Sequence, residues 1–226
     1  AVAEMPTAQE LTIDMVRDAA ARIKGTAFVT PLVYSDTFSG VSQVYLKLES
    51  LQRTGSFKLR GAYVAMSRLT EAQRAKGVCA CSAGNHAQGV AYAARQMGIS
   101  ATIFIPANAA QEKIDATRAY GVDVRLVGDS FEVAEEAALK YAKENDLTFV
   151  APYDDINVIS GQGTIGLEIL EQCPDVDAIV VPVGGGGLIS GIAFTVKTLK
   201  PDVLVYGVQT ETNPGMKTSL ENGKVV

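Results

Sequence analysis

The sequence predicts an α/β fold built on a parallel sheet. From Val78 onward, short apolar runs alternate with longer segments of helical period, which is the pattern of repeated βα units. Two of the predicted strands run into glycine-rich turns that open the next helix. In open parallel sheets, ligands bind where such turns lie outside the carboxyl ends of the strands. We therefore expect both turns to face one crevice that holds a ligand.

The composition excludes several classes of protein. With 226 residues, 47% of them hydrophobic and 20% charged, the chain has the make-up of a folded globular protein. A formal net charge of −5 offers no basic surface to a nucleic acid. No apolar run is long enough to span a bilayer, and residues 1–6 lack the charged start and apolar core of a signal sequence. We expect a soluble cytoplasmic protein with no nucleic-acid or membrane partner.

Few side chains are available for acid–base chemistry. His86 is the single histidine, which rules out a multi-histidine metal site, and a Ser-His-Asp triad would have to use it. Cys79, Cys81 and Cys173 have spacings that fit neither a zinc site nor a disulfide framework, so we expect reduced core residues. No metal site is predicted. Lysine, carboxylates, hydroxyls or a cofactor must do most of the chemistry.

The elements follow in chain order. One helix is predicted within the first 25 residues, because Ile13, Val16, Ala20 and Ile23 recur at helical spacing. Alternation over residues 41–49 predicts a strand with one polar face. The predicted strands of the parallel sheet are 78–82, 101–106, 122–127, 148–151, 178–183 and 203–208. The predicted helices between them are 85–97, 110–120, 131–144, 163–171 and 188–199.

A lysine opens the helix that precedes this sheet. Ser56 is a plausible N-cap, and Lys58 follows two residues later, in the first turn. The positive end of a helix disfavours a cation, and its amides bind anions instead. Lys58 is therefore the candidate reactive group; the alternative is a solvated surface lysine.

Two glycine-rich turns carry the remaining candidate residues. Gly184, Gly185, Gly186 and Gly187 precede Leu188 at a helix start, which predicts a phosphate cradle of backbone N–H groups. A merely tight turn is the alternative, but four glycines cost roughly 1 kcal/mol each in chain entropy, more than a turn requires. The other turn consists of Ser82, Ala83, Gly84, Asn85 and His86. Taken alone, Asn85 could be a helix cap, and His86 fits a packed, hydrogen-bonded residue better than a base.

One motif is misleading. Gly161, Gly163 and Gly166 match the G-x-G-x-x-G dinucleotide fingerprint. However, the preceding predicted strand ends too early for this motif. The position at which a ribose-binding acid would be expected also falls within the run of glycines, so no acid is present there. An NAD-dependent oxidoreductase is therefore kept only as an alternative.

Three stretches together, residues 56–62, 82–89 and 182–188, resemble the fold-type II pyridoxal-phosphate enzymes, specifically threonine dehydratases (threonine ammonia-lyases) of the short catabolic type. The resemblance extends from about Thr30 to the last residue. It implies a tryptophan synthase beta-like α/β fold with two open lobes and a cofactor cleft between them. The small lobe would comprise residues 58–153, and the large lobe residues 1–57 plus 154–226.

The resemblance also implies roles for single residues. Lys58 would bind pyridoxal 5'-phosphate covalently and act as the catalytic base. Phe57 would lie against the cofactor ring, Asn85 would bond its 3'-oxygen, and Gly184 to Gly187 with Leu188 would hold its phosphate. Residues 82–86 would bind the amino-acid substrate. The implied reaction is the dehydration and deamination of L-threonine to 2-oxobutanoate and ammonia, or of L-serine to pyruvate and ammonia. The resemblance also implies a role in amino-acid metabolism, including isoleucine biosynthesis, and assembly as a homo-oligomer.

Two further alternatives belong to the same fold. One is a serine racemase-like enzyme, which needs a second acid–base group on the opposite face of the carbanion. In racemases, that group resembles a serine at the position where this chain has Ala83. Dehydration is therefore favoured. Family members also continue beyond the position of Val226, into a part that should complete the large lobe and face the pyridine nitrogen with a hydroxyl. A catalytically incomplete cofactor-binding fragment is the third alternative.

Overall fold

The computed structural model describes residues 11–225, which form two compact units. Unit 2 is Ala21–Pro152, and unit 1 combines the described residues up to Ala20 with those from Tyr153 onward. The prediction about residues 1–6 lies outside the described residues. Residues 21–57 group with unit 2 by their backbone contacts, whereas the resemblance places them in the large lobe. The division into lobes stays a prediction.

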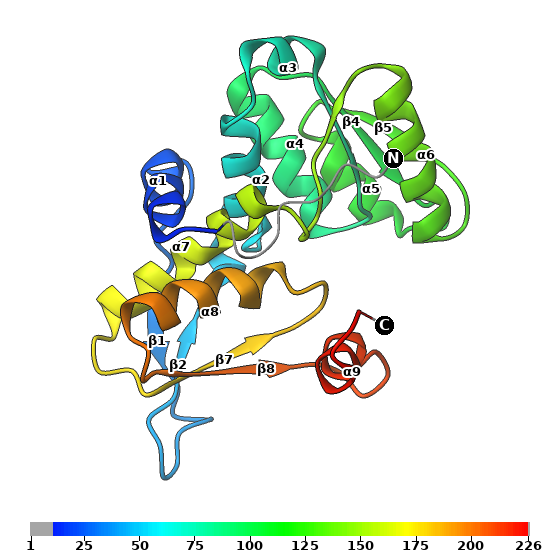
Figure 1. The fold of residues 1–226 in the computed structure, drawn as a ribbon. Coiled ribbons are helices and arrows are strands. Elements are labelled where there is room, and N and C mark those ends of the chain that lie inside the picture. Colours follow the sequence, from blue (N-terminus) through cyan, green and yellow to red (C-terminus); the bar gives the residue numbers. More distant parts are fainter. Residues whose placement is uncertain (1–10, 226) are drawn as a thin grey trace. The chain divides into compact units, whose positions relative to one another are not determined.

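Unit 2 is built on a parallel sheet of four strands in the order β5-β4-β3-β6 (Figure 1). Its strands are β1 (Leu32–Tyr34), β2 (Tyr45–Lys47), β3 (Val78–Cys81), β4 (Ala101–Ile105), β5 (Asp123–Leu126) and β6 (Thr148–Phe149). Its helices are α2 (Lys58–Ser67), α3 (Glu71–Lys76), α4 (Asn85–Met97), α5 (Gln111–Arg118), α6 (Phe131–Glu144) and a short 3-10 helix (Glu49–Leu51), and α1 (Ile13–Ile23) crosses the boundary between the units. The predicted βα order is confirmed.

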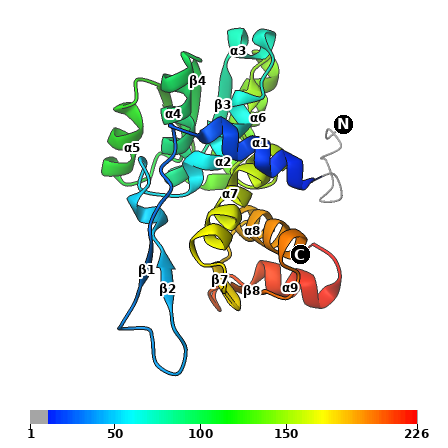
Figure 2. The ribbon, with the colours of Figure 1, turned by 90° about the vertical axis from the view of Figure 1, so that its left-hand side faces the viewer.

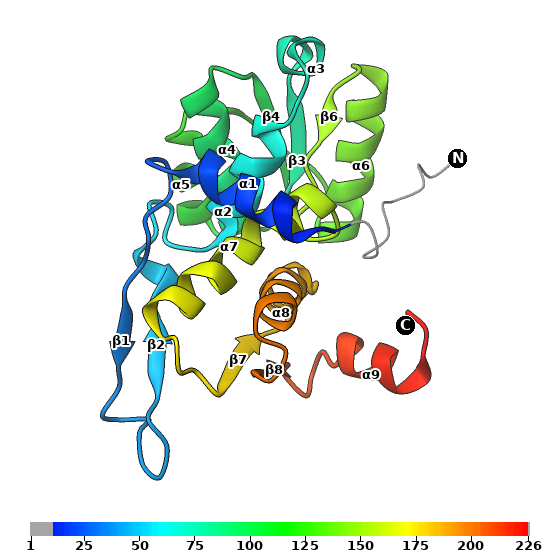
Figure 3. The ribbon, with the colours of Figure 1, turned by 60° about the vertical axis from the view of Figure 1, so that its left-hand side comes forward.

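Both faces of this sheet are covered. Val78 and Ala80 of β3 belong to a core shared with α2, α4 and α5, while Cys79 and Cys81 pack with α6. Figure 3 shows α4 and α6 on opposite sides of the sheet. Cys79 and Cys81 are free and buried, as predicted, and burial raises the pKa of each to about 12. Cys173 is also free, but it is only partly buried and is not a core residue. Burial on both faces explains why β3 and β4 are continuous apolar runs.

The hairpin of unit 2 is shorter than its sequence pattern predicts. Only Tyr45–Lys47 of the predicted strand 41–49 is extended in the sheet, and it pairs antiparallel with β1. The hairpin projects away from the four-stranded sheet (Figure 2). Leu46 is exposed although its alternation predicts a buried face. Alternation alone therefore overestimated both the length and the burial of this strand.

Unit 1 contains a two-stranded parallel sheet, β7 (Ala178–Pro182) and β8 (Leu204–Val208), with α7 (Ile156–Gln172), α8 (Gly187–Leu199) and α9 (Gly215–Asn222). The prediction that α7 begins at residue 163 is wrong. Asp155 caps the helix, and its Oδ1 accepts hydrogen bonds from the backbone N–H groups of Asn157 at 2.8 Å and Val158 at 3.0 Å. No described helix has the length and apolar character needed to cross a membrane.

The glycines of the misleading motif lie inside α7 and serve helix packing. A Cβ on Gly163 would lie 2.8 Å from Thr195 Oγ1 on α8, and one on Gly166 would lie 3.1 Å from Thr195 Cβ. From the other side, a Cβ on Gly191 would lie 2.4 Å from the carbonyl oxygen of Ile159. These glycines let α7 and α8 approach closely. They do not form the strand-to-helix turn that a dinucleotide site requires.

Candidate functional site

Lys58 is the first residue of α2, in a partly buried position. The Ser56 hydroxyl accepts the Lys58 backbone N–H at 3.3 Å, but Ser56 lies one residue before the N-cap instead of at it, as was predicted: the N-cap is Phe57, and no side chain caps the helix. Lys58 Nζ donates to the carbonyl oxygen of Pro152 at 2.6 Å and lies 5.4 Å from the ring centroid of Phe57. Burial lowers the pKa of Lys58 from 10.5 to about 8. A substantial share of this amine is therefore neutral and nucleophilic at mildly alkaline pH.

A buried ion pair fixes the helix that carries Lys58. The side chain of Arg60 is fully buried, and it donates to Glu49 from Nε at 2.9 Å and from Nη2 at 2.8 Å. Arg60 Nη2 also donates to the carbonyl oxygen of Phe28 at 3.1 Å, and the Thr30 hydroxyl donates to Glu49 at 2.5 Å. The first turn of α2 is thereby tied to two segments distant in sequence.

Gly89 brings α4 against the same turn. A Cβ at this position would lie 3.1 Å from the carbonyl carbon of Lys58 and 3.2 Å from the backbone nitrogen of Leu59. Such contacts are tighter than most Cβ atoms make, and the atoms they meet are backbone, so the approach of α4 to the Lys58 backbone favours a glycine here. Gly89 was not among the site residues predicted from the sequence.

The turn before α4 presents polar groups at the head of a helix. Gly84 N donates to the Ser82 hydroxyl at 3.1 Å, and Ser82, Ala83 and Gly84 are all partly buried. α4 begins at Asn85, and no side chain caps it. The capping interpretation of Asn85 is therefore wrong. Its exposed amide is available to a ligand.

His86 is buried and neutral. Only 2% of its surface is exposed, and its Nε2 lies 2.9 Å from the carbonyl oxygen of Val150. Because a carbonyl only accepts, Nε2 carries the proton, and the opposite nitrogen, Nδ1, has no partner among the described residues. Burial lowers the pKa of His86 to about 4; the Val150 carbonyl opposes this shift, and the charge of Lys58 adds to it. This environment supports the interpretation of His86 as a packed residue.

The glycine loop of unit 1, Gly184 to Gly187, connects β7 to α8. The structure of the protein itself explains why three of these residues are glycines. Gly186 has φ +93°, and a Cβ on Gly185 or Gly187 would collide with Tyr153. Gly184 differs, because a Cβ there would meet nothing within 4 Å. Leu188 is half-buried in the first turn of α8. The helix start and the open side at Gly184 suit an anion.

The two units hold different parts of the candidate site. Unit 2 carries Phe57, Lys58 and residues 82–86, and unit 1 carries the glycine loop and Leu188. Within unit 2, Lys58 and His86 both bind main-chain oxygens of one short segment, at Pro152 and Val150. This segment was not predicted as part of the site, because a backbone carbonyl leaves no signature in a sequence.

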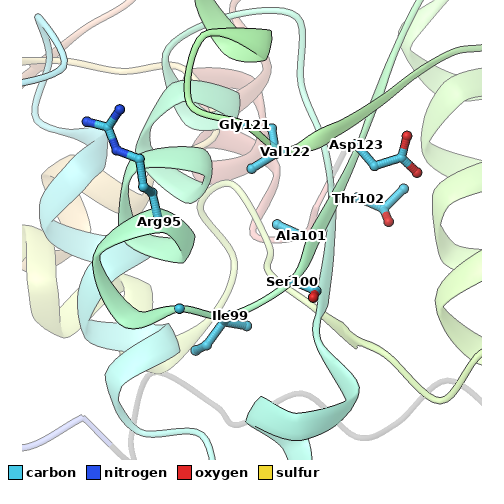
Figure 4. Close-up of a pocket in the computed structure, with 9 residues that line it drawn as sticks. Arg95, Ile99, Ser100, Ala101, Thr102, Gly121, Val122 and Asp123 are labelled. Atoms are coloured by element: carbon cyan, nitrogen blue, oxygen red, sulfur yellow. The ribbon is translucent and has the colours of Figure 1, made fainter.

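A separate pocket of about 360 Å³ lies at the amino ends of the strands of the four-stranded sheet (Figure 4). Its lining comes from the end of α4 and the amino ends of β4 and β5: Arg95, Gly98, Ile99, Ser100, Ala101, Thr102, Gly121, Val122 and Asp123. Residues 82–86 follow the carboxyl end of β3, and the strands are parallel, so this pocket is distinct from the candidate site. Within residues 11–225, no group of three or more His, Cys, Asp or Glu side chains could hold a metal ion.

Comparison with known proteins agrees with this geometry. Residues 23–226 match the family described as pyridoxal-phosphate dependent enzyme. The chain is 50% identical over 216 residues to an L-threonine ammonia-lyase of Thermotoga maritima and 44% identical over 217 residues to the catabolic L-threonine dehydratase of Escherichia coli K12. Each match covers 95% of this chain, but only 54% and 66% of the two relatives. The chain thus spans about half to two thirds of their length.

Solved structures give the same fold. The processed form of threonine deaminase isoform 2 from Solanum lycopersicum has a TM-score of 0.92 and 41% identity, over 98% of this chain and 62% of that one. Maize serine racemase also has a TM-score of 0.92, with 36% identity over 96% of this chain and 66% of that one. The predicted tryptophan synthase beta-like α/β fold is therefore confirmed, and the chain belongs to the pyridoxal-phosphate dependent enzyme family.

Proposed function

We propose that this chain is the greater part of a threonine ammonia-lyase, which dehydrates and deaminates L-threonine, and L-serine, to 2-oxobutanoate or pyruvate and ammonia. The observation that carries the proposal is the partly buried amine of Lys58, whose pKa is lowered to about 8 at a helix start. The names of the Thermotoga and Escherichia relatives support the substrate. The catabolic name of the second favours threonine degradation over isoleucine biosynthesis.

The residues present fit the cofactor, pyridoxal 5'-phosphate. We assign its covalent attachment to Lys58, its phosphate to Gly184 to Gly187 with Leu188, and its 3'-oxygen to Asn85. Phe57, whose ring is near Lys58 Nζ, would lie against the cofactor ring. The open side at Gly184, the uncapped start of α4 and the exposed Asn85 amide support these roles. A cleft between lobes 58–153 and 1–57 plus 154–226 is part of the proposal.

In this reaction, bound pyridoxal phosphate supplies an electron sink next to the α-carbon of the amino acid. Once the amino group of the substrate has replaced it on the cofactor, neutral Lys58 Nζ would take the Cα proton, and that proton, passed on to the β-hydroxyl, would let the hydroxyl leave as water. A later addition of water releases ammonia, so that the keto acid and ammonia are the net products. Ser82, Gly84 and the backbone N–H groups at the start of α4 would orient the substrate carboxylate. His86, being neutral, would contribute position and not charge.

Serine racemase chemistry remains the alternative because the maize enzyme shares the fold. A racemase needs a proton donor on the face opposite Lys58, and the methyl group of Ala83 cannot serve as one. We therefore propose elimination without racemisation. Assembly as a homo-oligomer and a cytoplasmic location stay predictions.

Labelling tests the assignment of Lys58. The chain is loaded with pyridoxal 5'-phosphate, treated with borohydride and digested, and we expect the label on Lys58 alone. Lys58→Ala should remove the label and the turnover, whereas the matched surface variant Lys140→Ala should keep both, since the Lys140 side chain is 74% exposed. A label elsewhere, or turnover by Lys58→Ala, would refute the assignment.

Product analysis tests the reaction. A keto-acid assay with L-threonine and L-serine should detect 2-oxobutanoate and pyruvate, and chiral chromatography should detect negligible D-serine. D-serine formed as fast as pyruvate would support the racemase alternative. A chain that binds the cofactor but yields no product would support the cofactor-binding fragment.

A further inference from the structure

Tyr153 lies against the glycine loop of its own unit. A Cβ built on Gly185 would lie 2.3 Å from Tyr153 Cδ1, 2.4 Å from Cγ and 2.6 Å from Cε1. No real Cβ makes such contacts, and the atoms concerned belong to a flat ring that cannot shorten. The absent side chain of Gly185 therefore leaves room for the tyrosine ring.

The main chain of Tyr153 makes a second close approach to the loop. A Cβ on Gly187 would lie 2.8 Å from the carbonyl oxygen of Tyr153 and 3.0 Å from its Cα. Gly187 is the first residue of α8, so this contact reaches the helix start itself. Gly184, in contrast, has open space on its side. One side of the loop is thus packed by Tyr153, and its Gly184 end is left open.

The segment that precedes Tyr153 in the chain contacts the candidate reactive groups. The preceding residue, Pro152, accepts a hydrogen bond from Lys58 Nζ at 2.6 Å, and Val150 binds His86 at 2.9 Å. The short segment 150–153 therefore contacts the amine, the imidazole and the glycine loop. The sequence pattern marked this stretch only as the end of a strand.

We propose that Tyr153 is a positioning residue, whose ring and backbone hold Gly185 to Gly187 in the form that binds the cofactor phosphate. The inference rests on the proposed function, because it takes the phosphate of pyridoxal 5'-phosphate as the ligand of this loop. It differs from the interpretation in which the glycines only make room for phosphate. In our interpretation, Gly185 and Gly187 make room for Tyr153, and Tyr153 keeps the helix-start N–H groups facing the open side at Gly184.

The first experiment compares the affinity for two cofactor forms by absorbance titration of the full chain. Tyr153→Leu should weaken binding of pyridoxal 5'-phosphate by about tenfold or more while leaving binding of pyridoxal, which lacks the phosphate, within about threefold. Tyr153→Phe retains every ring atom near Gly185 and should bind both forms as the unmodified chain does. Equal losses for both forms, or no loss, would overturn the proposal.

The second experiment asks what the missing Cβ of Gly185 accommodates. Gly185→Ala should lower the melting temperature markedly, because the new methyl group meets the Tyr153 ring. Adding Tyr153→Ala to Gly185→Ala should recover part of that loss, whereas Gly184→Ala, with open space around its Cβ, should change the melting temperature little. Strictly additive effects of the two substitutions would show that Tyr153 does not hold Gly185, and would overturn the proposal.

The two experiments separate this inference from the proposed function. If the unmodified chain binds neither cofactor form, the proposed function fails, and the melting temperatures still decide whether Tyr153 holds the loop. If the unmodified chain binds and Tyr153→Leu binds equally well, the inference alone fails.

Discussion

Lys58 and His86 are both titratable groups whose charged forms are disfavoured by burial. Each therefore makes the stability of the cofactor-free chain depend on pH, in a range set by its own pKa. The two ranges do not overlap, so each residue can be tested separately.

Lys58→Met should be more stable than the unmodified chain at pH 7. The pKa of Lys58 is about 8 in the folded chain and 10.5 ordinarily, so below pH 8 both states are protonated and the cost of a partly buried charge is fully present. Between these values the unfolded chain holds more protons, so the cost falls as pH rises. The gain in urea-unfolding free energy should be largest near pH 7 and should disappear above pH 10.5. A gain that did not change with pH would contradict burial of the charge.

His86 should make the chain less stable in weak acid. Its pKa is about 4 when folded against 6.5 ordinarily, so the unfolded chain binds more protons between these values, and stability present above pH 6.5 is lost as pH falls toward 4. His86→Gln can still donate an N–H to Val150 but does not titrate. Its melting temperature should therefore fall less than that of the unmodified chain between pH 6.5 and pH 4.5. Parallel melting curves for the two proteins would rule out this role for His86.

Sequence alone indicated Lys58 and the glycine loop, because helix-start position and consecutive glycines are visible in the letters. It could not indicate the partners of these residues. Lys58 and His86 bind the carbonyl oxygens of Pro152 and Val150, and every residue has such an oxygen. The importance of Gly89 was hidden for a related reason, because it depends on the approach of a helix that is not adjacent in sequence.

At the scale of elements, the ion pair between Glu49 and Arg60 should be the main support of α2. Glu49→Gln removes the charge of the carboxylate that pairs with the fully buried Arg60, and breaking a buried pair in this way costs roughly 3–5 kcal/mol of unfolding free energy. Denaturation in urea measures this loss. Arg17→Ala, which breaks an exposed pair with Asp14, is the control and should cost less than about 1 kcal/mol. A loss for Glu49→Gln as small as that of the control would refute the supporting role.

Most βα elements were predicted to within two residues, because buried strands and amphipathic helices have clear periods. The start of α7 was missed by seven residues, from 156 to 163. Gly161, Gly163 and Gly166 lower helix propensity, and the close contact with α8 that requires two of them cannot be recognised without both helices in place. The strand predicted at 41–49 failed in the opposite direction, since its alternation continues through a loop.

At the scale of the whole molecule, the two units should differ in local stability. Strands β3 and β4 of unit 2 are buried along their whole length, whereas Tyr206 and Val208 of β8 in unit 1 are 53% and 54% exposed. Amides open more readily where few apolar contacts cover them. Hydrogen exchange followed by mass spectrometry should show β8 exchanging roughly tenfold or more faster than β3 and β4. Equal protection of β8 would mean that exposure does not govern its opening.

The division of the chain into two units could not be read from local sequence patterns. The backbone contacts change from one unit to the other between Pro152 and Tyr153, and the division into lobes that the resemblance implies stays a prediction. The grouping of residues 21–57 with unit 2 is accompanied by long-range contacts such as those of Arg60 with Phe28 and Glu49. Such long-range pairs leave no local pattern.

Residues 150–153 have no regular secondary structure, and segments of that kind usually tolerate insertions and deletions during evolution. This one should not, because Val150 contacts His86, Pro152 contacts Lys58 and Tyr153 contacts the glycine loop, and the number of residues between these three contacts is fixed. A single added residue would move Tyr153 by one step and could leave only one end of the segment in its proper contact. Among homologous chains, length variation should therefore accumulate in the hairpin loop 35–44 and be excluded from this connector.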